Sequence, residues 1–524
     1  MDFGHTVRTA LHLLSMKPLD NVVIVGAGPT GLVLALWLTA LGVKVRIVVK
    51  ARGPGMQSRA LAVQARTLEL YRQLGLAEAV VAAGHRNAAL NLWTSGKKRA
   101  TLRFANAGAD LTPYPYVLIY PQDRHERLLI ARLEDMGVAV EREAECLGFE
   151  DRGDHVEVQL RLPGGREQRC AAAYVVGCDG ARSIVRHQMG TGFPGATYGK
   201  FFYVADVQAH GPAARGDIQI ALDDADFVAW LAYDDQGRGR LIGVVDDDGA
   251  DRADTLSFHD VGHRAIAHIG IEVDKVHWFS TYRVHHRVTD RYRTGRAFLA
   301  GDAAHVHSPA GGQGMNTGIG DAINLAWKLA AVLRQGAPVA LLDSYQAERR
   351  AFALRLVETT DRLFQFITAE GRFADFVRTR IAPVVAPLAY GIDDVREYLF
   401  RLLSQTLISY RGGPISEGQA GAVQGGDRLP WVHTDDNHAP LCAIAWQVHV
   451  YGRARADLAA WCEAQGMALH RFDFGAAHAA AGLQRDAAYL LRPDSYIGCV
   501  AADGSPLRLE AYLNRCIRHS DGQQ

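Results

Sequence analysis

The chain lacks the features that mark several classes of protein. Its seven cysteines include no CxxC pair, so the sequence indicates neither a zinc site nor a disulfide framework, and a reducing cytoplasm is the expected location. No apolar run reaches the roughly 20 residues that a membrane helix needs. Basic and acidic residues both number 57, so no net charge draws the chain to nucleic acid or to an anionic membrane. We therefore expect neither a nucleic-acid nor a membrane partner.

The length and composition of the chain indicate a globular protein of several domains. It has 524 residues, of which 48% are hydrophobic and 22% are charged, a balance typical of soluble globular proteins. A chain of this length suggests about two to four domains. Residues 1–19 are interpreted as an N-terminal extension that precedes the first recognisable element.

The first motif is a glycine-rich turn between an apolar strand at 21–25 and a buried helical pattern at 32–38. The turn has the form G-x-G-x-x-G, with Gly26, Gly28 and Gly31 as its glycines. In a dinucleotide-binding βαβ unit the first glycine permits the tight turn, and the second lets the backbone approach a pyrophosphate. The third lets the helix pack closely on the strand. A plain glycine-rich turn is the alternative interpretation.

The acidic residue expected in such a unit is missing. An aspartate or glutamate roughly 20 residues after the glycines usually binds the ribose hydroxyls. Val49 occupies that place, at the end of a second predicted strand, and Lys50 follows it. The absence indicates either weaker dinucleotide binding or ribose contacts from elsewhere in the chain. Lys50 could reach a phosphate, but we favour its interpretation as a surface lysine at a strand end.

The second motif is another junction between a strand and a helix. A strand at 173–176 is followed by Asp179 and Gly180, and a helix then begins with Ser183 and carries Arg186 in its first turn. Taken alone, this pattern is equally compatible with a simple strand-to-helix connection.

The third motif joins a strand to a long helix through a loop rich in glycine. Residues 297–300 form a strand-like run that ends in Gly301 and Asp302, where a carboxylate can bind sugar-like hydroxyls. A Pro-Ala-Gly-Gly loop at 309–312 then leads into a helix that starts near Met315. Free backbone N–H groups at such a helix start can bind an electron-rich carbonyl. A glycine loop between two core elements is the alternative.

In this order and spacing, the three motifs resemble those of the flavoprotein aromatic hydroxylases of the p-hydroxybenzoate hydroxylase type, the group A flavoprotein monooxygenases. The closer likeness is to the phenol and polyketide hydroxylase branch, over about residues 20–400. The resemblance implies non-covalently bound FAD. It assigns the pyrophosphate to Gly26, Gly28, Pro29, Thr30 and Gly31; further FAD contacts to Arg59, Gln122 and Arg127; FAD and NAD(P)H together to Asp179, Gly180 and Arg186; the ribityl and ribose part to Asp302; and the flavin ring to the loop bearing Pro309, Gly311, Gly312, Gly314, Met315 and Asn316.

The resemblance also implies a reaction cycle in which NADPH or NADH reduces FAD. The reduced flavin and O2 then form a C4a-hydroperoxide that hydroxylates a small aromatic substrate, phenolic or polyketide-like. No catalytic residue is assigned, because His285, His286, His305 and His307 are candidates for a base by residue type only. No metal site is indicated.

Two other functions are considered. A flavin-dependent halogenase would carry a Trp-x-Trp-x-Ile-Pro segment, and the sequence has none. A homologue that binds FAD or a metabolite without hydroxylase turnover is the remaining alternative, and the missing acid at Val49 favours it.

The predicted fold class is α/β, α+β overall, with a Rossmann-like FAD-binding domain at 20–190 and 291–400 that includes a helical segment. A β-rich substrate domain at 191–290 is inserted into it, and a thioredoxin-like domain without CxxC is expected at 415–524. The substrate pocket is expected between the β-rich domain and the flavin. On one strand Trp230 and Tyr233 would face opposite sides, so core packing is the favoured role for either. The C-terminal domain is expected to be structural or to form an oligomer contact, such as that of a homodimer.

Overall fold

A six-stranded sheet forms the centre of the N-terminal region in the computed structural model, which describes residues 21–55, 60–222, 227–245, 256–261, 263–308, 312–368 and 393–518. Five of its six strands are parallel to one another. Each of these is reached by a crossover through a helix or a further sheet, as parallel strands require. In spatial order the strands are β18 (Arg293–Thr294), β19 (Ala297–Leu299), β12 (Tyr174–Gly177), β1 (Asn21–Val25), β2 (Lys44–Val49) and β8 (Val140–Arg142).

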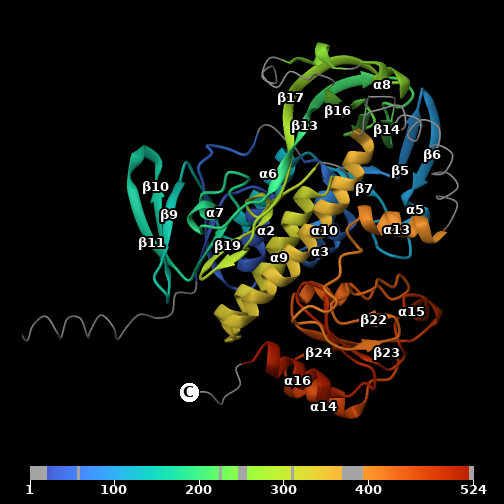
Figure 1. Ribbon diagram of the computed structural model, residues 1–524. Coiled ribbons are helices and arrows are strands. Elements are labelled where there is room, and N and C mark those ends of the chain that lie inside the picture. Colours follow the sequence, from blue (N-terminus) through green and yellow to red (C-terminus); the bar gives the residue numbers. More distant parts are fainter. Residues whose placement is uncertain are drawn as a thin grey trace, which may run out of the picture.

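Helix α2 (Pro29–Ala40) lies buried against this sheet, which explains why its sequence is apolar on almost every side. Two longer helices, α9 (Gly314–Gln335) and α10 (Asp343–Thr368), run through the middle of the molecule, and α9 packs on α2 (Figure 1). Helices α3 (Ala65–Gln73) and α6 (Gln122–Asp135) complete this layer. In the described ranges, no helix is long and apolar enough to cross a membrane.

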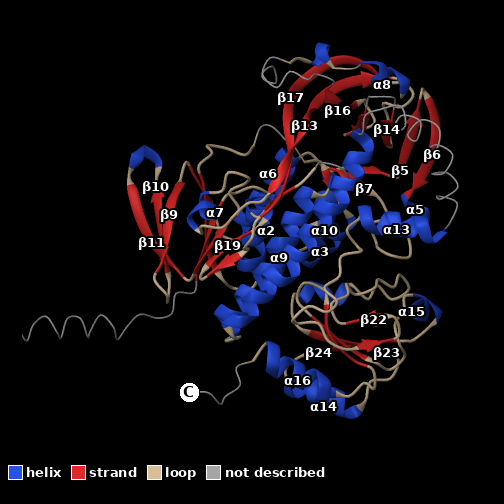
Figure 2. Cartoon of the chain, in the orientation of Figure 1, coloured by secondary structure: helices blue, strands red, loops and turns tan. Residues whose placement is uncertain are grey.

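The β-rich region is an eight-stranded sheet that arches over one end of α10 (Figure 2). It contains the strands expected between 191 and 290, but it also takes strands from two other segments of the chain. The boundaries of the predicted domains therefore do not coincide with the edges of this sheet. In spatial order the strands are β20 (His305–Val306), β17 (Glu272–Val288), β13 (Gly195–His210), β16 (Arg238–Val245), β15 (Phe227–Ala232), β14 (Ile218–Leu222), β5 (Ala89–Thr94) and β6 (Lys97–Arg103).

The two faces of the eight-stranded sheet differ, as the alternation along β15 predicts. Trp230 is fully buried in a cluster with α8 (His263–His268) on one face. Tyr233 packs on the other face, in a cluster that includes Phe400 of α13 (Asp393–Leu403). Residues three apart on a strand point to opposite sides, so the expected packing roles of both aromatic residues agree with the structure.

The C-terminal region forms a small four-stranded sheet with the strand order of a thioredoxin-like fold. β23 and β24 are parallel, β25 is antiparallel to β23, and β26 is antiparallel to β25. All seven cysteines of the chain are free thiols. The elements are β23 (Gln447–Tyr451), α14 (Ala456–Ala464), β24 (Ala468–Phe472), α15 (Ala476–Ala480), β25 (Ala488–Leu491), β26 (Ile497–Ala501) and α16 (Pro506–Cys516).

The glycine-rich segment at 412–426, whose composition is typical of a linker, belongs to this C-terminal fold. It contains a hairpin of β21 (Gln419–Ala420) and β22 (Val423–Gln424), which packs on β26. Gly418 has a φ of +79°, and a methyl group there would lie 2.1 Å from the carbonyl oxygen of Val500. The glycines thus permit close approach of two backbones rather than a flexible connection.

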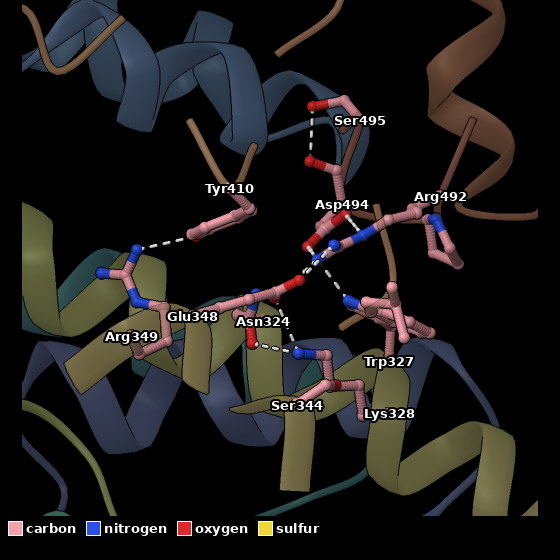
Figure 3. A network of polar contacts seen from close by, with 12 residues as sticks. Asn324, Trp327, Lys328, Ser344, Glu348, Arg349, Tyr410, Arg492, Asp494 and Ser495 are labelled. Atoms are coloured by element: carbon pink, nitrogen blue, oxygen red, sulfur yellow. Dashed lines mark hydrogen bonds and ion pairs between the residues drawn. The ribbon is translucent and has the colours of Figure 1, made fainter. Parts of the chain in front are cut away.

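A network of buried charges joins α9 and α10 to the C-terminal domain (Figure 3). Glu348 of α10 accepts hydrogen bonds from Lys328 of α9 at 2.8 Å and from Arg492 at 2.6 and 3.1 Å. Arg492 also donates to Asp494, and all four side chains are at most 3% exposed. Burial opposes the charge of Glu348, but Arg492 and Lys328 lower its pKa to about 2. The two positive and two negative charges therefore balance within the protein.

Replacing Glu348 by glutamine should destabilise the protein strongly, by about 3–5 kcal/mol, because Lys328 and Arg492 would remain buried without their carboxylate. Urea unfolding followed by circular dichroism would measure this change. The matched control is Glu145→Gln, which removes surface ion pairs with the 76%-exposed Lys50 and with Arg161 and should cost less than about 1 kcal/mol. Equal effects of the two substitutions would contradict a special role for the buried network.

The same network predicts how stability depends on acid. The pKa of Glu348 is about 2 in the folded protein against an ordinary value of 4.5, so its contribution is complete above pH 4.5 and is lost as the pH falls towards 2. The difference in unfolding free energy between the wild type and Glu348→Gln should therefore shrink as the pH is lowered through this window. Urea titrations at a series of pH values would test it, and a difference that stays constant would refute it.

Candidate functional site

The three glycines of the first motif have distinct surroundings at the carboxyl end of β1. Gly26 has a φ of +107°, and a methyl group on it would lie 2.3 Å from the carbonyl oxygen of Cys178. A methyl group on Gly31 would lie 2.0 Å from the carbonyl oxygen of Gly26. Gly28, by contrast, has nothing within 4 Å of that position and is the N-cap of α2, with no side chain capping the helix. The first N–H groups of α2 are thus arranged as an anion-binding site requires.

The second motif meets the first through Asp179. Its Oδ2 accepts hydrogen bonds from the backbone N–H groups of Ile184 at 2.8 Å and Val185 at 3.4 Å, which begin α7 (Ile184–Gln188). Its Oδ1 is buried and has no hydrogen-bond partner among the described residues. Burial raises the pKa of Asp179. A buried carboxylate oxygen without a partner fits a ligand that donates a hydrogen bond. Gly180, which follows, has a φ of +79°.

The third motif packs directly on the other two. A methyl group on Gly301 would lie 2.5 Å from Oγ1 of Thr30, and a methyl group on Gly318 of α9 would lie 2.3 Å from the same atom. Arg186 donates to the carbonyl oxygen of Ala303 at 2.9 Å and so ties the second motif to the third. Asp302 lies exposed beside this junction, in the short helix η4 (Gly301–Ala303). The three motifs thus meet at one edge of the parallel sheet.

A buried aspartate in α9, which sequence reasoning missed, supports the third motif from beneath. Asp321 accepts hydrogen bonds from the backbone N–H of Gly301 at 3.1 Å, from Nε2 of His305 at 2.6 Å and from Nε of Arg349 at 2.6 Å. Burial opposes its charge, but Arg349 and His305 lower its pKa. A lone carboxylate within a helix that is otherwise expected to be buried was the available signal.

The four candidate histidines have different environments. His305 is held by Asp321, and His285 is exposed on β17, where Nδ1 lies 2.8 Å from Oγ1 of Thr197. His286, also on β17, is half-buried. His307 adjoins Gly314 of the loop predicted to contact the flavin, and its Nε2 is buried without a partner among the described residues. Burial, with the nearby His305, lowers the pKa of His307 to about 4, so its imidazole is neutral at pH 7.

The described part of the predicted flavin loop is fixed by the side chain of Asn316. Its amide oxygen accepts from Gln64 N at 2.9 Å and from Thr67 Oγ1 at 2.8 Å, and its nitrogen donates to the carbonyl oxygens of Ala62 at 2.9 Å and Gly312 at 3.0 Å. These four bonds use the full capacity of an amide. The side chain therefore holds the loop in place, while the backbone of Gly312, Gly314 and Met315 lies beside it. Pro309, Gly311 and Arg59 lie outside the described residues.

Gln122 holds one end of the segment that contains Arg59. Its Oε1 accepts from Ala60 N at 3.3 Å, and its Nε2 donates to Glu126 at 2.8 Å. Glu126 in turn accepts from Gly55 N at 3.3 Å, at the other end of that segment. Arg127 is 62% exposed and pairs with Asp123.

Lys50 forms the surface ion pair with Glu145 at 2.7 Å, in agreement with the interpretation we favoured. Val49, whose carbonyl oxygen accepts from Ala144 N at 3.1 Å, ends β2. Within the described ranges, no group of three or more histidine, cysteine, aspartate or glutamate side chains could hold a metal ion.

Comparison with known proteins covers most of the chain. The family described as "FAD binding domain" matches residues 20–360. A 6-methylpretetramide 4-monooxygenase of Streptomyces rimosus is 37% identical over 417 residues, which cover 77% of this chain and 72% of that protein. The solved structure of an anhydrotetracycline hydroxylase from Streptomyces rimosus aligns with a TM-score of 0.74 at 30% identity, over 95% of this chain and 98% of the other. A Diels-Alderase from the biosynthetic pathway of pyrroindomycins aligns with a TM-score of 0.69 at 26% identity, over 94% and 98%.

Two alanine substitutions in the first motif should separate folding from ligand binding. Gly28→Ala should leave the apoprotein as stable as the wild type, because φ is −77° and the space is open, but should weaken FAD binding by about tenfold or more (about 1.4 kcal/mol) by filling that space. Gly26→Ala should also destabilise the apoprotein, by about 1–3 kcal/mol, through its positive φ and the contact with Cys178. Thermal melting and flavin fluorescence titration measure the two effects. Unchanged FAD affinity of Gly28→Ala would argue against a pyrophosphate at this turn.

Proposed function

Because this chain belongs to the FAD binding domain family, we propose that it is an FAD-dependent monooxygenase that hydroxylates a phenolic or polyketide-like aromatic compound. NADPH or NADH is the reductant and O2 the oxygen source. The observation that carries the proposal is the meeting of three motifs at one sheet edge, with open space beside Gly28 and an unpartnered oxygen on Asp179. The names of similar proteins support the reaction: one is a 6-methylpretetramide 4-monooxygenase and another an anhydrotetracycline hydroxylase.

The residues present fit FAD, and each motif would hold a different part of it. The N–H groups after Gly28 would bind the pyrophosphate. Asp179 and Asp302 would accept hydrogen bonds from hydroxyl groups of the ribose and ribityl parts, and the backbone at Gly312 to Met315 would lie against the ring. Bound FAD supplies hydride acceptance and oxygen activation, while the protein binds, orients and excludes water. These individual assignments are part of the proposal.

The substrate is proposed to bind between the flavin loop and the inner face of the eight-stranded sheet. A methyl group on Gly312 would lie 2.9 Å from Cβ of Ala62, so the loop is in contact with that residue. Ala62 belongs to an apolar cluster that extends to Leu231 and Tyr233 of the sheet. An apolar surface of this kind suits an aromatic ring and keeps water from the reacting carbon.

A cluster of three polar side chains lies within this otherwise apolar face. Arg240 is fully buried and forms two hydrogen bonds with Asp206, at 2.6 and 2.8 Å, and the hydroxyl of Tyr233 donates to the same carboxylate. The cluster lies on the same side of the sheet as Leu231. It places a largely buried pair of charges beside the apolar side chains of this face.

A second candidate function rests on the similarity to the Diels-Alderase. That protein shares the fold, and the reaction in its name, a Diels–Alder reaction, inserts no oxygen atom. A flavoprotein that binds a metabolite without hydroxylating it is therefore the alternative to be separated by experiment.

Turnover with a panel of aromatic compounds would decide between the two functions. Polycyclic phenols should stimulate NADPH or NADH oxidation by the FAD-loaded protein, and mass spectrometry should find one oxygen atom from isotopically labelled O2 in the product. Simple phenols and a reaction without aromatic compound are the comparisons. Stimulated oxidation that yields only hydrogen peroxide, or an unoxidised rearranged product, would favour the second function.

A further inference from the structure

We propose that residues 492–496 of the C-terminal domain, here called the docking turn, position the flavin loop at 312–316. This role depends on the proposed function only for its catalytic consequence, because the contacts themselves are made between residues of the chain. The C-terminal domain has no CxxC pair, and its cysteines are free. Its contribution would instead be mechanical, through two chains of contacts that begin at the docking turn and lead to the flavin loop and to the residues of α9 that follow it.

The first chain of contacts passes through two consecutive residues of α3. Arg66 donates to the carbonyl oxygen of Asp494 at 2.9 Å and to Oγ of Ser495 at 2.9 Å, and its guanidinium lies 4.8 Å from the ring of Tyr496. Thr67, the next residue, donates to Asn316 at 2.8 Å. Arg66 and Thr67 are 3% and 1% exposed. Because adjacent residues of one helix move together, a shift of the docking turn is transmitted to the amide that holds the loop.

The second chain of contacts passes through α10. The ring of Tyr496 lies 4.4 Å from that of Tyr410, whose hydroxyl accepts from Arg349 at 2.8 Å. Arg349 also donates to the carbonyl oxygen of Thr317 at 3.0 Å and to Asp321 at 2.6 Å. Thr317 follows the flavin loop directly in the first turn of α9, and Asp321 lies one turn further along this helix. Figure 3 shows Arg349 and Tyr410 on one side of Glu348 and the docking turn on the other.

A small cavity with both polar and apolar lining residues separates the two chains of contacts. It is lined by Arg66, Asn316, Arg349, Asp494 and Tyr496, among others, and offers about 20 Å³ to the centre of a water molecule. That is room for about one water. Around this cavity, the docking turn and the flavin loop are linked by the hydrogen bonds and the ring contact described above. Such contacts fix orientation, because a hydrogen bond weakens steeply when its angle changes.

The test compares two arginines of α3 that both reach the C-terminal domain. Arg66→Met removes the bonds to the docking turn together with a buried ion pair to Glu69 of the same helix, at 3.1 Å. Arg72→Met, the matched control, removes an ion pair with Asp436 of the same domain, at 2.5 and 2.8 Å. Hydrogen–deuterium exchange of the full-length protein, with and without FAD, would report on the amides of residues 312–317. We expect exchange about tenfold faster in Arg66→Met (about 1.4 kcal/mol of lost protection) and unchanged exchange in Arg72→Met.

A spectroscopic readout accompanies the exchange measurement. In the FAD-loaded protein, Arg66→Met should change the visible circular dichroism of the flavin and raise the fraction of NADPH oxidation that ends in hydrogen peroxide, whereas Arg72→Met should do neither. Tyr496→Leu, which removes the ring shared by both chains of contacts, replaces Arg66→Met if that variant does not fold.

The outcomes are decisive for the proposal. Equal exchange in Arg66→Met and the wild type, or equal acceleration in both arginine variants, overturns it. Failure to hydroxylate any aromatic compound would overturn the proposed function instead, and would leave the exchange result interpretable.

Discussion

Helix α9 contains ionised side chains that are completely buried, and the rest of the structure depends on keeping them paired. Near its start, Asp321 binds the turn of the third motif together with His305 and Arg349. Two turns later, Lys328 meets Glu348 and, through it, Arg492 of the C-terminal domain. An unpaired buried charge costs several kcal/mol. The cofactor edge and the domain junction are therefore two ends of one electrostatic arrangement along a single helix.

Through this arrangement the C-terminal domain contributes structural contacts to the rest of the chain, whereas its free cysteines indicate no dithiol chemistry. Its docking turn completes the set of partners for Glu348 and Arg66, which come from helices that otherwise face the FAD half of the chain. The inner face of the eight-stranded sheet, with the pair of Asp206 and Arg240, is built from different residues. The proposed substrate face and the docking turn thus draw on different residues of the chain.

Much of this could be predicted from local sequence patterns. The strands and helices of the βαβ unit follow from apolar periodicity, and Gly26 and Gly31 follow from the close approach that their spacing implies. The pairing of β5 with β14 could not be predicted, because neither strand carries a local signal for its partner. The same holds for the bond between Arg66 and Ser495, which lie 429 residues apart. The binding roles of the individual site residues remain predictions, and Arg59, Pro309 and Gly311 lie outside the described residues.

The network around Glu348 also has a consequence for the order in which the chain matures on the ribosome. Lys328 and Glu348 emerge well before Arg492, and until that arginine arrives the two helices hold one negative and one positive charge without the second pair that surrounds them in the finished protein. Domains fold as units from the N-terminus during synthesis. The buried carboxylate of Glu348 therefore acquires its full set of partners only after the C-terminal domain has been synthesised.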